Sequence, residues 1–239
     1  MTVLVIGGAG YIGSVLVSHL LGKGYRVVVF DSLSLGAASL LSFWHQSNFS
    51  FFKGDVRSKL DLTASLAGVD AIVNLAAIIG EKACVARPKV AREINRDAAI
   101  HIGELARTKR IPRYVFVSTC SNYGMSRSRG KATEETLLGP LSLYSETKVA
   151  AEKAILAQAS TTFSPTVVRL ATAFGVSPRM RFDLIVNEFV WAAHHKIPIV
   201  LYKPHAWRPL VHVRDIAEAI ETVLLADKKT ISHKVFNIE

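Results

Sequence analysis

The sequence MTVLVIGGAGYIG, residues 1–13, decides the fold. Val3 to Ile6 form an almost wholly apolar run, which is typical of a parallel strand covered on both faces. Glycines follow this run, at Gly7, Gly8, Gly10 and Gly13. From Ile12 onward the apolar residues recur with the period of a helix. A strand, a glycine turn and a helix in this order predict the dinucleotide-binding fingerprint, in which the backbone approaches a pyrophosphate closely at a helix N-terminus.

A second apolar run, VVVFD, ends in an acidic residue that indicates which dinucleotide binds. Asp31 lies 18 residues past Gly13. A carboxylate at this place accepts hydrogen bonds from the adenosine ribose and repels a 2′-phosphate, so the sequence favours NAD over NADP. The alternative interpretation is a glycine turn followed by a helix-capping aspartate.

Length and composition narrow the class of protein. A chain of 239 residues can form one large α/β domain or one and a half. Half of the residues are hydrophobic, yet no apolar stretch approaches the roughly 20 residues that span a bilayer, and the sequence shows no cleavable leader. We therefore expect a cytoplasmic protein with no membrane partner. Cys84 and Cys120 resemble neither a disulfide framework nor a metal cluster, so no metal is expected.

The net charge of +10 has three interpretations: nucleic-acid binding, a small anionic ligand that carries phosphates, or a solvated basic surface. Lysines and arginines are scattered along the chain, and their densest group is MSRSRGK at 125–131. Basic and aromatic residues do not interleave in a stripe, which argues against a nucleic-acid partner.

The order of the expected elements indicates the architecture. Further strands are expected near 26–31, 49–53, 70–77, 113–119 and 166–172, and helices near 12–23, after Gly36, at 60–67 and at 88–109. Strands that alternate with helices predict an α/β fold with a doubly wound parallel sheet of the Rossmann type. We assign residues 1–174 to this domain, which is expected to bind NAD.

Residues 175–239 form a smaller, substrate-binding portion in this interpretation. It contains an amphipathic helix within 177–195, a short strand at 198–202, and a strand followed by a helix over 207–226. We expect 208–226 to pack back on the first domain. The remainder is expected over the carboxyl ends of the strands, where open α/β sheets bind ligands.

Tyr144 and Lys148 form the candidate catalytic pair. They lie four residues apart at the start of an expected helix, so they share one face. An adjacent ammonium and an oxidised nicotinamide would lower the pKa of the phenol, which would then act as a general base. The strand FVST ends at Ser118 and Thr119 and brings hydroxyl groups to the same carboxyl edge.

Several motifs together resemble those of one family. The chain is similar to extended short-chain dehydrogenases/reductases of the NAD-dependent epimerase/dehydratase type, which act mostly on nucleotide sugars. It carries GGAGYIG at 7–13, GDVR at 54–57, NLAA at 74–77, STCSNYG at 118–124 and YSETK at 144–148. The resemblance implies cofactor contacts from Gly7, Gly10, Tyr11, Ile12, Gly13, Asp31, Asp55, Val56, Leu75, Ala76, Ala77, Tyr144 and Lys148. It also implies the catalytic residues Thr119, Tyr144 and Lys148 and the substrate contacts Thr119, Asn187 and Arg208.

One departure from the family pattern concerns the reaction. The positions after Thr119 are acidic in the family's dehydratases and decarboxylases, but here they are Cys120 and Ser121. The resemblance therefore implies an epimerase: Tyr144 takes the proton of a ring hydroxyl, hydride passes to NAD, and hydride returns to the opposite face of the keto-sugar. The alternatives are an NAD-dependent sugar dehydrogenase or ketoreductase, and a non-catalytic dinucleotide-binding module that could bind RNA. The Tyr-Lys pair favours an enzyme.

A second departure concerns length. Family chains normally continue well beyond VFNIE at 235–239, so the substrate-binding portion is expected to be incomplete, with NAD binding intact and affinity for nucleotide sugars poor. The family also dimerises through two helices, which match 90–108 and 145–159 here. The resemblance therefore implies a homodimer.

Overall fold

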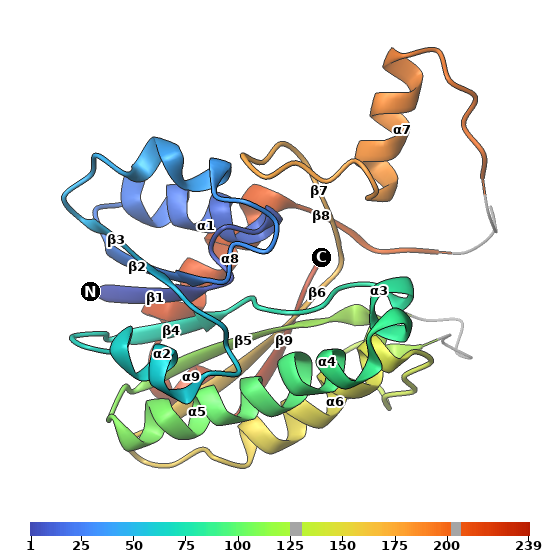
Figure 1. Ribbon diagram of the computed structural model, residues 1–239. Helices are drawn as coiled ribbons and strands as arrows, with labels where there is room; N and C mark the ends of the chain where they lie inside the picture. The colour runs from blue at the N-terminus through green and yellow to red at the C-terminus, as the bar shows by residue number, and fades with distance from the viewer. Residues whose placement is uncertain (125–130, 202–206) are drawn as a thin grey trace.

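The computed structural model describes residues 1–124, 131–201 and 207–239. Its centre is a seven-stranded parallel sheet with the order β3-β2-β1-β4-β5-β6-β9 (Figure 1). The strands are β1 (Thr2–Ile6), β2 (Arg26–Asp31), β3 (Phe49–Lys53), β4 (Ala71–Asn74), β5 (Arg113–Thr119), β6 (Ser164–Leu170) and β9 (Lys234–Ile238). This confirms the expected α/β fold with a doubly wound parallel sheet.

Helices cover both faces of this sheet (Figure 1). One face carries α1 (Tyr11–Gly22), the 3-10 helix η1 (Ala38–Phe43), α8 (Val213–Leu225) and α9 (Lys228–Ile231). The other carries α2 (Lys59–Ala64), α5 (Ala99–Thr108) and α6 (Leu143–Leu156). The helix expected at 88–109 begins as α4 (Pro88–Arg92), passes through a π-helical turn, η2 (Glu93–Ala98), and continues as α5. A short helix, α3 (Glu81–Ala86), precedes it.

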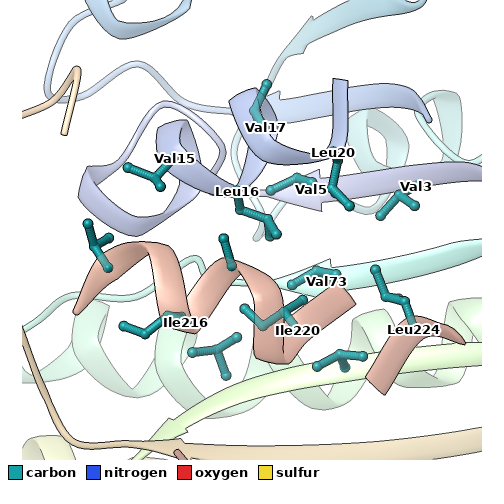
Figure 2. Close-up of a cluster of buried hydrophobic side chains, with 14 of the residues drawn as sticks. Val3, Val5, Val15, Leu16, Val17, Leu20, Val73, Ile216, Ile220 and Leu224 are labelled. Carbon is teal, nitrogen blue, oxygen red and sulfur yellow. The ribbon is translucent and has the colours of Figure 1, made fainter. Parts of the chain in front are cut away.

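The two cores follow from the alternation of side chains along β1. Val3 and Val5 point to the face covered by α1 and α8, where they pack with residues such as Leu16 and Ile220 (Figure 2). Leu4 and Ile6 point to the other face, beneath α2, α5 and α6. All four side chains are fully buried, as expected for a central strand of a parallel sheet.

The segment after β6 differs in part from the expectation. A small two-stranded sheet forms from β7 (Thr172–Phe174) and β8 (Leu210–His212), and α7 (Ile185–His194) projects away from the rest of the chain (Figure 1). The strand expected at 198–202 was wrong over residues 198–201, which are exposed and form no ladder. Tyr202, like residues 125–130 of the basic group, lies outside the described residues.

The last third of the chain also supplies parts of the main sheet layer. α8 packs beside α1 on the same face of the sheet, and β9 pairs with β6. The division at 174/175 stays a prediction, but its second part, 175–239, thus contains a strand of the central sheet. Within the described part of the chain, no helix is long and apolar enough to cross a membrane.

Candidate active site

The glycine turn between β1 and α1 is shaped for close approach of a ligand. Gly7 has φ +84°, and a Cβ built on it would lie 2.9 Å from the backbone nitrogen of Ala76. A Cβ on Gly13 would collide with the carbonyl oxygen of Gly7. Gly10 is the N-cap of α1 and supplies no side-chain cap, so the first N–H groups of the helix face outward toward an anion. This cradle fits the pyrophosphate of a dinucleotide.

Asp31, at the carboxyl end of β2, is fixed beside this turn. Its carboxylate accepts a hydrogen bond from the backbone N–H of Ala9 at 3.0 Å and a second from the N–H of Leu33 at 2.8 Å. Ala9 belongs to the glycine turn, so the acid and the turn are held in one arrangement. The Asp31 carboxylate, which we expect to accept hydrogen bonds from the ribose hydroxyls, therefore lies next to the pyrophosphate cradle.

The residues after β4 border the same turn. The N–H of Leu75 donates to the carbonyl of Ile6, and the side-chain oxygen of Asn74 accepts from the N–H of Ala76 at 3.1 Å. The other end of the Asn74 side chain donates to the buried hydroxyl of Tyr114 at 2.9 Å. Residues 75–77, which the resemblance assigns to the cofactor, thus lie against Gly7.

The Asp55–Val56 turn after β3 lines a cavity of about 600 Å³. Arg57 forms an ion pair with Asp55 at 2.6 Å and reaches Glu93 of η2 at 3.1 Å. The guanidinium of Arg57 lowers the pKa of Asp55 below its ordinary value. The carboxylate of Asp55, which the resemblance assigns to the cofactor, is therefore oriented by Arg57, two residues further along the chain.

Lys148 is held at the carboxyl end of β5. The capping box of Ser142 and Ser145 begins α6, and one turn later the Lys148 ammonium donates to the carbonyl of Val117 at 2.9 Å. Its nitrogen lies 4.5 Å from the centroid of the Phe116 ring. Burial lowers the pKa of Lys148 to about 8, although the carboxylate of Glu152 opposes the shift.

Tyr144 lies one turn before Lys148 and is half-buried. Burial raises the pKa of Tyr144 above its ordinary value, Cys84 raises it further, and the guanidinium of Arg181 lowers it in part. The sequence predicted a lowered pKa for Tyr144 beside Lys148 and an oxidised nicotinamide; in the chain alone the cost of desolvating a phenolate raises this pKa.

Thr119 ends β5, two residues beyond the carbonyl that holds Lys148, and its side-chain oxygen accepts from the N–H of Ser121 at 3.1 Å. The thiol of Cys120 turns away toward the carbonyl of Arg169, at 3.4 Å. Burial raises the pKa of Cys120 to about 11. Thr119 thus lies at the carboxyl edge of the sheet, and Cys120 beside it is a half-buried thiol that stays protonated at neutral pH.

A buried network behind the catalytic pair was not predicted. Arg169 of β6 and Glu152 of α6 form an ion pair at 2.7 Å with side chains that are 5% and 2% exposed. Glu152 also accepts from Asn122, and Arg169 donates to the hydroxyl of Tyr123. The sequence carried one signal of this network: Glu152 follows Lys148 by four residues in YSETKVAAE, so the two side chains share one face of the helix.

The two expected diphosphate contacts have different surroundings. Asn187 of α7 is buried, and its amide accepts from the N–H of Gly175 at 3.0 Å and donates to the hydroxyl of Tyr11 at 3.1 Å and to the carbonyl of Arg181 at 3.0 Å. Arg208 is exposed, in the segment before β8. The structure therefore brings the cofactor residues, Thr119 and the Tyr-Lys pair to the carboxyl edge of the sheet. The side chain of Asn187 is used in hydrogen bonds within the chain. Arg208 lies at the surface.

Comparison with known proteins agrees with this geometry. The chain is 32% identical to the uncharacterized UDP-glucose epimerase YtcB of Bacillus subtilis over 236 residues, which cover 94% of this chain and 72% of YtcB. The structure of DesIV, a dTDP-glucose 4,6-dehydratase from Streptomyces venezuelae with NAD and TYD bound, matches with a TM-score of 0.87 and 30% identity, over 100% of this chain and 75% of DesIV. MoeE5 in complex with UDP-glucuronic acid and NAD matches with a TM-score of 0.84 and 28% identity, over 100% of this chain and 76% of MoeE5.

The family model described as "NAD dependent epimerase/dehydratase family" matches residues 3–238. Because this match spans nearly the whole chain, the protein belongs to the NAD-dependent epimerase/dehydratase family of enzymes.

Proposed function

We propose that the protein is an epimerase of a nucleotide sugar that works by transient oxidation with NAD. One observation carries the proposal: α6 places Tyr144 and Lys148 at the end of β5 that holds Thr119, on the sheet edge that also holds the glycine cradle. Relatives solved with nucleotide sugars or nucleotides and NAD, such as MoeE5 and DesIV, support this substrate class.

Each residue of the pair has a distinct task. Tyr144 takes the proton of a ring hydroxyl and later returns it, while Thr119 donates a hydrogen bond to the same oxygen. Lys148, fixed by the carbonyl of Val117, holds a positive charge that stabilises the phenolate of Tyr144, which is the form that takes the proton. NAD, which the glycine cradle and Asp31 would hold, would supply the hydride acceptor and then the hydride donor, so the reaction would have no net redox change.

The residues after Thr119 favour epimerisation over elimination. Loss of water from a sugar needs a further acid or base near the reacting carbons. The thiol of Cys120 is directed to the carbonyl of Arg169 with its pKa raised to about 11, and Ser121 carries a hydroxyl that is not an acid at neutral pH. Neither side chain supplies that proton transfer.

The proposal is tested by incubating the protein and NAD with UDP-glucose, UDP-galactose and their dTDP counterparts, followed by NMR of the sugar. We expect the epimer to accumulate without NADH. Stoichiometric NADH would instead indicate a dehydrogenase, and loss of the sugar's 6-hydroxyl would indicate a dehydratase.

A substitution of the proposed base tests the mechanism directly. Tyr144→Phe removes only the hydroxyl, so we expect turnover to fall by about 100-fold or more while the Kd for NAD, measured by calorimetry, stays within about twofold. Turnover at the wild-type rate in this variant would exclude Tyr144 as the base.

A further inference from the structure

The turn that follows β5 is closed by a side chain. Asn122 belongs to the 3-10 helix η3 (Cys120–Tyr123) and is fully buried, and its Nδ2 donates to the hydroxyl oxygen of Ser118 at 3.1 Å. This bond spans the residues that lie between the two. Inside it, the backbone N–H of Ser121 donates to the side-chain oxygen of Thr119 at 3.1 Å. Asn122 therefore closes the turn that carries Thr119.

The same amide nitrogen also holds this turn against α6. It donates to the carboxylate of Glu152 at 2.7 Å, and both side chains are buried. Because a carboxylate only accepts hydrogen bonds, the atom of Asn122 that faces it is the donor nitrogen. The amide oxygen of Asn122, Oδ1, has no partner among the residues that the structure describes. The side chain is thus used for its two donors.

Two strands of the sheet complete the arrangement. Ser118 of β5 is the register partner of Arg169 of β6, and Arg169 donates to Glu152 with both Nε and Nη2. Asn122 therefore closes a ring of contacts that joins β5, η3, α6 and β6. Buried polar networks of this kind make the elements that they connect rigid relative to one another.

The ring contains the strand end on which the proposed reaction depends. The residue before Ser118 is Val117, whose carbonyl accepts from the Lys148 ammonium at 2.9 Å, and the residue after it is Thr119. Lys148 and Glu152 lie four positions apart on α6, so they share one face of that helix. A shift of Ser118 would therefore move Thr119 relative to Lys148.

We propose that Asn122 is a positioning residue for Thr119: it fixes the turn so that the Thr119 hydroxyl donates to the oxygen of the sugar carbon that is oxidised. This inference rests on the proposed function, in which Thr119 makes that hydrogen bond. The hydroxyl accepts from Ser121 and keeps one proton to donate. At position 122 an aspartate would place a second carboxylate against Glu152, and a leucine would supply no donor. Among side chains of this size, only the amide of asparagine supplies two donors.

Methyl NMR measures the position of Thr119 without any substrate. The threonine methyl groups are labelled with carbon-13, and the Thr119 signal is assigned by its loss in Thr119→Val. Asn122→Leu removes both donated bonds at nearly constant volume, so we expect it to shift the Thr119 signal or to split it into several. Ser118→Ala removes only the bond across the turn and should displace the same signal, so the result does not depend on one variant.

Thr166→Val is the matched control. Thr166 is buried on β6 and donates to the carbonyl of Ile231 at 3.0 Å, so this variant also loses a buried hydrogen bond. Its register partner is Val115, at a distance along β5 from Thr119. We expect the control to leave both the Thr119 signal and turnover unchanged. Thermal unfolding of every variant checks that the fold is kept.

Turnover separates a positioning role from a structural one. Asn122→Leu should lower kcat for epimerisation roughly 10- to 100-fold, the effect of a small displacement of a reacting group, while the Kd for NAD and the KM for the nucleotide sugar stay within about twofold. In a Thr119→Val background the same substitution should lower kcat by no more than about twofold, because Asn122 acts through a hydroxyl that is already gone.

Two results would overturn the inference and leave the proposed function standing. One is a Thr119 signal in Asn122→Leu that matches the wild type. The other is a pair of kcat losses, from Asn122→Leu and Thr119→Val, that multiply in the double variant, because Asn122 would then act on another group. A wild type that epimerises none of the nucleotide sugars would contradict the proposed function, and the Thr119 signal would still decide whether Asn122 positions the turn.

Discussion

At the scale of a single residue, burial of the Lys148 ammonium carries an electrostatic cost. Its pKa is lowered from 10.5 to about 8, so the native state releases a proton more readily than the unfolded chain. Between these pH values the unfolded chain binds more protons, and the free energy of unfolding therefore rises with pH across this window. Below about pH 8 both states are protonated and the full cost of burying the ammonium applies.

This sign gives a testable pH dependence. Relative to Lys148→Met, the wild type should gain stability from pH 8 to pH 10.5, by up to about 3 kcal/mol. Denaturant unfolding of both proteins at pH 7, 8, 9 and 10.5 measures the difference between their unfolding free energies. The contributions of the other titrating groups cancel in this difference. A difference that is flat or falls over this range would show that Lys148 is not desolvated as the structure indicates.

At this scale the sequence predicted residues whose role depends on local spacing. Gly7 and Gly13 were predicted because the glycine motif marks positions where a Cβ does not fit. Tyr144 and Lys148 were predicted because residues four apart share one face of a helix. The Glu152–Arg169 pair was missed because its two residues lie 17 positions apart on different elements, and only the fold brings them together.

At the scale of elements, the contact between α1 and the preceding turn depends on Gly13. Gly13→Ala places a methyl group on the carbonyl of Gly7, so we expect a loss of roughly 1–3 kcal/mol of stability and a much weaker affinity for NAD. Gly22→Ala, at the other end of the same helix, meets no atom within 4 Å and should be neutral or stabilising by up to about 1 kcal/mol. Chemical denaturation and NAD calorimetry of both variants measure the contrast; equal behaviour would contradict the steric explanation.

The Glu152–Arg169 pair joins α6 to β6. Glu152→Gln would leave the buried guanidinium without its counter-charge, and we expect a loss of about 3–5 kcal/mol of unfolding free energy. Lys153→Ala, on the next residue of the same helix, is exposed and should change stability by no more than about 0.5 kcal/mol. A Glu152→Gln protein as stable as the wild type would show that the pair is replaceable by neutral hydrogen bonds.

Elements were predictable where burial makes the pattern simple. β1 and β4 are mostly apolar because both faces of the sheet are covered, so their runs in the sequence are easy to recognise as strands. The apolar run at 198–201 has the same local character, but in the structure its residues have no neighbouring strand and are exposed. A short run cannot indicate whether a partner strand exists, because pairing is a property of distant segments.

For the whole molecule we predict a homodimer through α4, η2 and α6. Val149 is buried within its own chain, but Ala150 and Ala154 are half-buried on the outer surface of α6. Ala150 lines a shallow depression with Arg92 and Arg96, so Ala150→Arg would add a third positive charge there and should give monomers. Light scattering should give a mass of twice 26.1 kDa for the wild type. The control Thr222→Arg, on α8 at the other face of the sheet, should give the same mass. A monomeric wild type at micromolar concentration would refute the prediction.

The position of β9 also bears on how the chain is made. Every residue of β6 is buried, and its outer edge is covered only by β9, whose first residue follows the end of β6 by 64 positions (170 to 234). While a ribosome is still adding those 64 residues, β5 and β6 can pair, but the far edge of β6 has no partner. A strand whose backbone groups are unpaired along one edge is a template for pairing with other nascent chains. Translation through residues 171–233 is therefore the interval in which this protein most needs a chaperone.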